Sequence, residues 1–110
     1  MIHFEDLGPT LVLEVAGPTL DAHTSKEFRR DIENKLKDRK QVVIDMSQLS
    51  FMDSSGLGVL LSCLRQVGAA GGQLKLVGLT AHVRAVFQLV RMHRVFDIHN
   101  SREEALRSFA

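Results

Sequence analysis

Apolar positions near the start of the chain recur with the period of a β-strand. Residues 10–16 alternate in part, with Leu, Leu and Val at every second position from Leu11, which predicts a strand with one well-buried face. Residues 2–7 form a weaker strand pattern, and the Gly8-Pro9 pair between the two segments is a turn signal. The pattern therefore predicts an N-terminal β-hairpin.

Helical periods follow the hairpin. Phe28, Ile32 and Leu36 recur at every fourth position after capping residues at 24 and 25, and charged residues fill most other positions as far as residue 40. This spacing predicts an amphipathic surface helix. Ser101 and Glu104 have the spacing of a capping box at the start of the last helix. The other helical patterns cover residues 57–67, which are apolar almost all round, and 83–90.

Short apolar runs between these helices predict further strands. Residues 42–44 are all β-branched, which is typical of a strand covered on both faces, and residues 74–77 and 95–98 are the other candidates. Strands that alternate with helices favour parallel pairing through right-handed crossovers. We therefore predict an α/β fold in one domain over residues 1–110, with a mixed, mostly parallel sheet of four to five strands behind the hairpin.

This topology has a consequence for the site. The loops after Ala16, Met46 and Val77 all follow the carboxyl ends of strands predicted to be parallel, and such loops meet at one edge of the sheet, where α/β proteins place their sites. We therefore expect Asp21 to lie near the segment that begins at Asp53.

Composition excludes several classes of function. Fourteen Lys and Arg against thirteen Asp and Glu give no overall attraction to nucleic acid or to an anionic membrane. No apolar run approaches the ~20 residues that span a bilayer, and residues 1–6 lack the features of a signal peptide, so we expect a cytoplasmic protein. The single Cys63 lies in an apolar run and is interpreted as a small buried thiol.

The segment Asp53-Ser54-Ser55-Gly56 begins the most apolar helix. Asp53 is well placed as its N-cap, and the amide groups and dipole at a helix start favour an anion such as a phosphate beside Ser54. The residues alone leave open whether the two serines are modified or simply cap the helix. They also leave open whether Gly56 and Gly58 admit a partner's backbone or only fit the helix against its neighbours.

Two stretches carry a family resemblance. Residues 44–60, IDMSQLSFMDSSGLGVL, resemble the signature of the STAS domain in bacterial anti-sigma factor antagonists, and residues 16–33, AGPTLDAHTSKEFRRDIE, resemble the stretch that leads into the first helix of that family. The second stretch has one residue more than the commonest spacing between its glycine and Asp21. The resemblance covers essentially the whole chain.

The resemblance implies a regulator that switches partners. In proteins of this kind, the unphosphorylated antagonist binds an anti-sigma factor, which is also a serine kinase of the GHKL type, and thereby frees the sigma subunit. Carried over, the phosphoacceptor is Ser54, and the docking surface contains Asp21, Asp53, Ser55, Gly56 and Leu57. A PP2C-type phosphatase restores the active form. No cofactor is implied.

Other functions fit the residues less well. A serine hydrolase would need Gly-x-Ser-x-Gly, which is missing around Ser54, and the five histidines follow no partner or metal-ligand spacing. The Gly71-Gly72 pair precedes a strand, which is the wrong side for a phosphate-binding loop. We therefore expect no catalytic residues and no metal site. The remaining alternative is a STAS scaffold in a sensory assembly, or a subunit of a lipid-transport complex, that does not switch.

Overall fold

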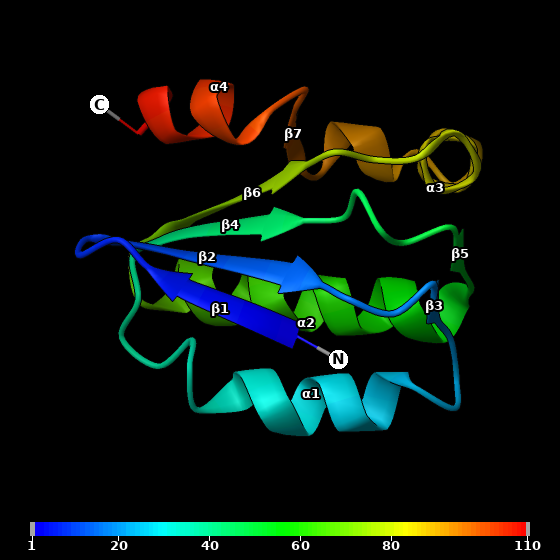
Figure 1. Cartoon of the computed structure of the whole chain (residues 1–110), viewed down its shortest axis with the longest axis horizontal. Coiled ribbons are helices and arrows are strands. Elements are labelled where there is room, and N and C mark those ends of the chain that lie inside the picture. Colours follow the sequence, from blue (N-terminus) through cyan, green and yellow to red (C-terminus); the bar gives the residue numbers. More distant parts are fainter. Residues whose placement is uncertain (1, 110) are drawn as a thin grey trace.

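A computed structural model describes residues 2–109 as a mixed five-stranded sheet with helices on both sides (Figure 1). The strands are β1 (Ile2–Asp6), β2 (Thr10–Val15), β4 (Gln41–Asp45), β6 (Gln73–Val77) and β7 (Asp97–His99), in the spatial order β1-β2-β4-β6-β7. β1 pairs antiparallel with β2, whereas the other neighbours are parallel. The predicted hairpin and the mostly parallel sheet are confirmed.

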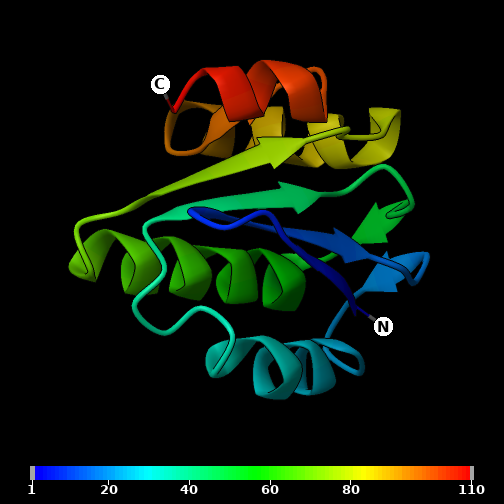
Figure 2. The ribbon, with the colours of Figure 1, turned by 60° about the vertical axis from the view of Figure 1, so that its left-hand side comes forward.

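The helices divide between the two faces of the sheet. α1 (Ser25–Glu33) and α2 (Ser54–Ala69) cover one face, and α4 (Arg102–Arg107) lies across the other (Figures 1 and 2). α3 (Ala81–Leu89) and the short 3₁₀ helix η1 (Met92–Arg94) connect β6 with β7. Within the described residues, none of the helices has the length and apolar composition needed to cross a bilayer.

Side-chain alternation along the strands explains why both faces can be covered. Val42 and Ile44 of β4 belong to the main core beneath α1 and α2, whereas Val43 belongs to a smaller cluster that includes Ala105 of α4. Successive strand residues point to opposite faces, so a continuous apolar run fits a strand that is packed on both sides. The prediction for residues 42–44 is confirmed.

Three elements differ from the sequence prediction. α1 ends at Glu33 rather than near residue 40, because the chain continues in tighter turns and Asp38 adopts a left-handed conformation with φ of 61°. The last strand is shifted to Asp97–His99, because Phe96 turns inward against Phe87. A two-stranded parallel pair, β3 (Thr19–Leu20) with β5 (Phe51–Met52), was not predicted.

Candidate functional site

Asp53 organises the start of α2. Its backbone is extended at the N-cap, and its Oδ1 atom accepts hydrogen bonds from the amides of Ser55 at 2.9 Å and Gly56 at 3.1 Å. Its Oδ2 atom accepts a third from the amide of Ala22 at 3.2 Å. The predicted N-cap is confirmed, and the same carboxylate also ties the loop before α1 to the start of α2.

Ser54 is the first residue of α2 and is exposed, whereas Ser55 is half-buried. The carboxylate of Asp53 is turned toward the backbone amides of the helix and of Ala22. Asp53 already accepts from the amides of Ser55 and Gly56, and the positive end of the helix dipole favours a further negative charge at such a position. Because Ser54 is exposed and Ser55 is half-buried, the hydroxyl of Ser54 is the more accessible of the two to another protein.

The two glycines of the first turns have different surroundings. A Cβ atom on Gly56 would overlap the carbonyl oxygen of Leu20 and lie 3.0 Å from its carbonyl carbon, whereas a Cβ on Gly58 would meet nothing within 4 Å. Gly56 is buried, and its missing side chain lets β3 approach the helix. Gly56 thus lies behind the surface, and Leu57 is half-buried against the core. Gly58 faces open space.

Asp21 caps the turn before α1. Its Oδ1 atom accepts hydrogen bonds from the amides of His23 and Thr24, each at 3.0 Å, and the Thr24 amide is the main reason that the pKa of Asp21 lies below its usual value. Thr24 occupies the predicted N-cap position without capping α1 through its own side chain, and Asp21 instead holds the turn that precedes the helix. The order of strands and helices predicted that this loop lies beside Asp53, and the hydrogen bond from Ala22 to Asp53 confirms it.

The loop between β4 and β5 is fixed at several points. The carbonyl of Pro18 accepts hydrogen bonds from the amides of Ser50 at 2.8 Å and Phe51 at 3.0 Å. The hydroxyl of Thr80, just before α3, donates to the carbonyl of Leu49 at 2.7 Å. Ser54 is therefore presented by a well-anchored segment.

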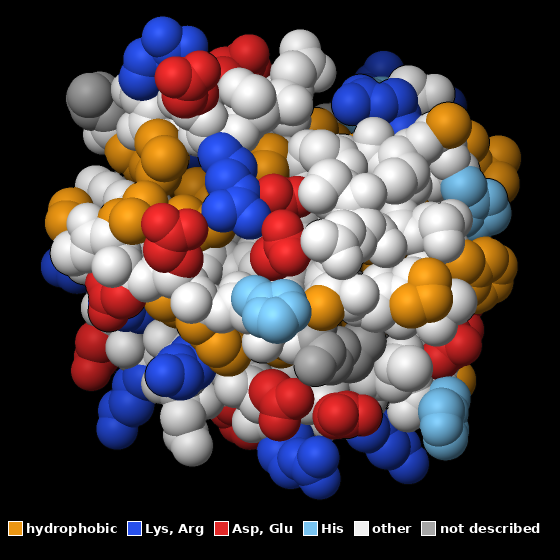
Figure 3. Space-filling model, in the orientation of Figure 1, with side chains coloured by type: hydrophobic (Ala, Val, Ile, Leu, Met, Phe, Trp, Pro, Cys, Tyr) orange, Lys and Arg blue, Asp and Glu red, His pale blue; other side chains and the backbone are white. Residues whose placement is uncertain are grey.

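Phe51 adds an aromatic contribution that the sequence analysis missed. Its side chain is 43% exposed and stacks on His82 of α3, with ring centroids 5.3 Å apart. Hydrophobic and histidine side chains gather along the right-hand edge of the molecule, over β5 and α3 (Figure 3). The only sequence signal was an aromatic residue in a loop two positions before Asp53.

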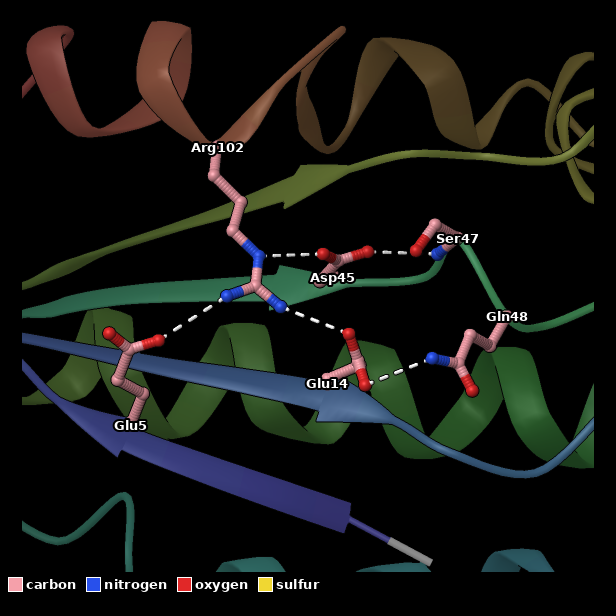
Figure 4. Close-up of polar contacts among 6 residues, drawn as sticks. All are labelled: Glu5, Glu14, Asp45, Ser47, Gln48 and Arg102. Carbon is pink, nitrogen blue, oxygen red and sulfur yellow. Dashed lines mark hydrogen bonds and ion pairs between the residues drawn. The ribbon is translucent and has the colours of Figure 1, made fainter.

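A second polar cluster lies on the α4 face of the sheet (Figure 4). Glu5, Glu14 and Asp45 come from three adjacent strands, and all three face α4 because they alternate with residues of the main core. Arg102 donates to Asp45 at 2.7 Å and to Glu14 at 3.1 Å, and it forms a longer contact with Glu5 at 3.4 Å. Carboxylate side chains surround a basic one at the centre of this face (Figure 3).

This cluster also holds the loop that leads to the site. The amide of Ser47 donates to Asp45 Oδ1 at 2.9 Å, and the side chain of Gln48 donates to Glu14 at 3.1 Å. Burial works against ionisation of Asp45, but the hydrogen bonds from Ser47 and Arg102 outweigh it and lower the pKa of that carboxyl. The Arg102 cluster thus fastens both α4 and the start of the β4–β5 loop to the sheet.

Replacing Arg102 by Leu should lower the free energy of unfolding by about 1–3 kcal/mol at pH 7, because Asp45, which is 8% exposed, then loses its cation. The lowered pKa of Asp45 stabilises the fold above about pH 4, and that stabilisation is lost as the pH falls through the folded-state pKa. The difference between wild type and Arg102→Leu should therefore shrink in acid. Urea unfolding at pH 7 and pH 3 measures it, and a difference that does not depend on pH would contradict this assignment.

Two other groups of side chains were candidates for chemistry. Cys63 is buried, and burial raises the pKa of its thiol to about 12, which agrees with the predicted small buried thiol. Among residues 2–109, no group of three His, Cys, Asp or Glu side chains is arranged to hold a metal ion.

Comparisons with known proteins point to one family. A model described as the STAS domain matches residues 2–105. BtrV of Bordetella bronchiseptica, named as a candidate anti-sigma factor antagonist, is 37% identical over 73 residues, which are 66% of this chain and 63% of that protein. The anti-sigma F factor antagonist of Paenibacillus polymyxa is 27% identical over 107 residues, which are 96% of this chain and 91% of that protein.

Solved structures agree with these sequence matches. The anti-sigma factor antagonist SpoIIAA in its unphosphorylated form superposes with a TM-score of 0.73 at 26% identity, covering 98% of this chain and 96% of that one. The phosphorylated form of the Bacillus cell fate determinant SpoIIAA superposes with a TM-score of 0.74 at 26% identity, covering all of both chains.

Proposed function

This chain belongs to the STAS family, and its relatives include anti-sigma factor antagonists, so we propose that it binds an anti-sigma factor and is switched off by phosphorylation of Ser54. The proposed partner is an anti-sigma factor with GHKL-type serine kinase activity, and a PP2C-type phosphatase would reverse the modification. The observation that carries the proposal is the exposed Ser54 at the first position of α2, directly after the Asp53 cap. The names of the relatives describe a regulatory role rather than a catalytic one.

The charge of a phosphate supplies the switch. Phosphorylation adds about −1.5 to −2 charges at pH 7, and the helix N-terminus tolerates that charge in the free protein. In a complex the same phosphate would be desolvated beside Asp53, and Asp21 lies in the neighbouring loop. Desolvation together with like charge weakens an interface without unfolding the protein.

Incubation with candidate GHKL-type kinases of the source organism and Mg-ATP tests the proposal by intact mass. We expect wild type to gain one phosphate, Ser54→Ala to gain none and Ser55→Ala to be modified like wild type. Phosphate incorporation into Ser54→Ala at the wild-type rate would move the site to another residue. If no kinase modifies or binds the wild type, the non-switching scaffold becomes the better description.

A further inference from the structure

A groove runs between α1 and α2 and begins beside the proposed phosphorylation site. It encloses about 560 Å³ and opens to solvent. Ser55 and Gly58 of α2 line one side, and the open space at the missing Cβ of Gly58 is part of it. The α1–α2 groove is lined by Ala22, Ser25, Lys26, Arg29, Ser55 and Gly58.

The charge of this groove is one-sided. Lys26 and Arg29 are exposed, and no carboxylate lies within 4.0 Å of either basic group anywhere in the part of the chain that the structure describes. Among the other Lys and Arg side chains of the described residues, four do have a carboxylate within 4.0 Å, namely Arg30, Arg39, Lys75 and Arg102. The six lining residues include two positive charges and no negative one.

The groove continues along α1 as an apolar hollow. Arg29 lines both parts. Beyond it the apolar wall is formed by Ile32 of α1 with Val59 and Cys63 of α2, and the polar side chains of Glu33, Ser62 and Gln66 complete the lining. A segment lying along the two helices would thus meet positive charge at the Ser54 end and apolar side chains further on. Two neighbouring positive charges that form no ion pair within the chain favour an acidic occupant.

We propose that the α1–α2 groove docks an acidic segment of the anti-sigma factor partner. This rests on the proposed function, and it names a contact of that complex beyond Ser54 and its neighbours. Because Lys26 and Arg29 are exposed, their attraction acts mainly on the rate of association and makes it dependent on salt. The carboxylates of the occupant contact Lys26 and Arg29, and its apolar side chains pack into the adjoining hollow.

The first test needs no identified partner. A blocked hexaglutamate peptide is titrated into ¹⁵N-labelled protein, and we expect the amide shifts to change around Ser55, Gly58 and Lys26. A Lys26→Glu, Arg29→Glu double variant should lose these changes, whereas Arg30→Glu, on the same helix but outside the groove, should keep them. Shift changes spread over all exposed arginines, or retained by the double variant, would overturn the assignment of the groove as an acid-binding surface.

The second test uses the GHKL-type kinase that modifies the chain. The double variant should associate with it about 10-fold more slowly than wild type or Arg30→Glu, and salt should reduce this difference. An unchanged association rate would show that the partner's acidic segment does not use the groove. If no kinase binds even the wild type, the proposed function fails, while the peptide titration still decides whether the groove binds acidic chains.

Discussion

The Gly56→Ala variant should lose about 1–3 kcal/mol of unfolding free energy or more, a large effect for one added methyl group. The new Cβ would overlap the carbonyl oxygen of Leu20 and lie 2.9 Å from Cγ of Met52. Because one of these neighbours is backbone, no change of rotamer can relieve the overlap. The β3–β5 pair or the start of α2 must shift. Either movement disturbs the hydrogen bond that the amide of Ala22 donates to Asp53.

Gly58→Ala is the matched control for this substitution. It makes the same chemical change two residues later in the same helix, where an added Cβ meets nothing within 4 Å. Alanine is favoured over glycine inside a helix, so this variant should gain up to about 0.5–1 kcal/mol. Urea unfolding of both variants checks the pair. Equal stabilities would show that Gly56 is not required for the close approach of Leu20.

The Ser54→Asp variant should bind the anti-sigma partner about 10- to 100-fold more weakly than wild type, which corresponds to roughly 1.4–2.8 kcal/mol. A carboxylate at this exposed position would be buried beside Asp53 on docking, where like charge and desolvation oppose binding. The effect of one carboxylate is smaller than that of a phosphate, because it carries less charge and fewer acceptor oxygens. Calorimetric titration against the kinase without ATP measures the loss.

Stability should change in the opposite direction. A negative charge in the first turn of α2 favours the helix by about 0.3–1 kcal/mol, so Ser54→Asp should unfold at a slightly higher urea concentration than wild type. Ser54→Asn separates charge from size, because it has nearly the same shape without the charge, and it should retain most of the affinity. Equal affinity of wild type and Ser54→Asp, or equal losses for Asp and Asn, would contradict an electrostatic switch.

Local patterns in the sequence determined most of the fold. Alternation in residues 10–16 and the β-branched run at 42–44 predicted β2 and β4, and the order of strands and helices predicted parallel pairing. The Asp53 cap was also predictable, because a cap depends on amides two and three residues away. Within the site, the same topology placed the loop of Asp21 beside Asp53.

Features that depend on distant residues were decided only by the tertiary structure. Arg102 meets Asp45 and Glu14 across 57 and 88 residues of chain, and nothing in the local pattern around Arg102 indicates those partners. Gly56 and Gly58 look alike in the sequence, and only the position of Leu20 gives them different roles. Periodicity along a chain specifies which face of an element is buried. Which groups then meet across two buried or exposed faces depends on how the elements pack, and therefore on the whole fold.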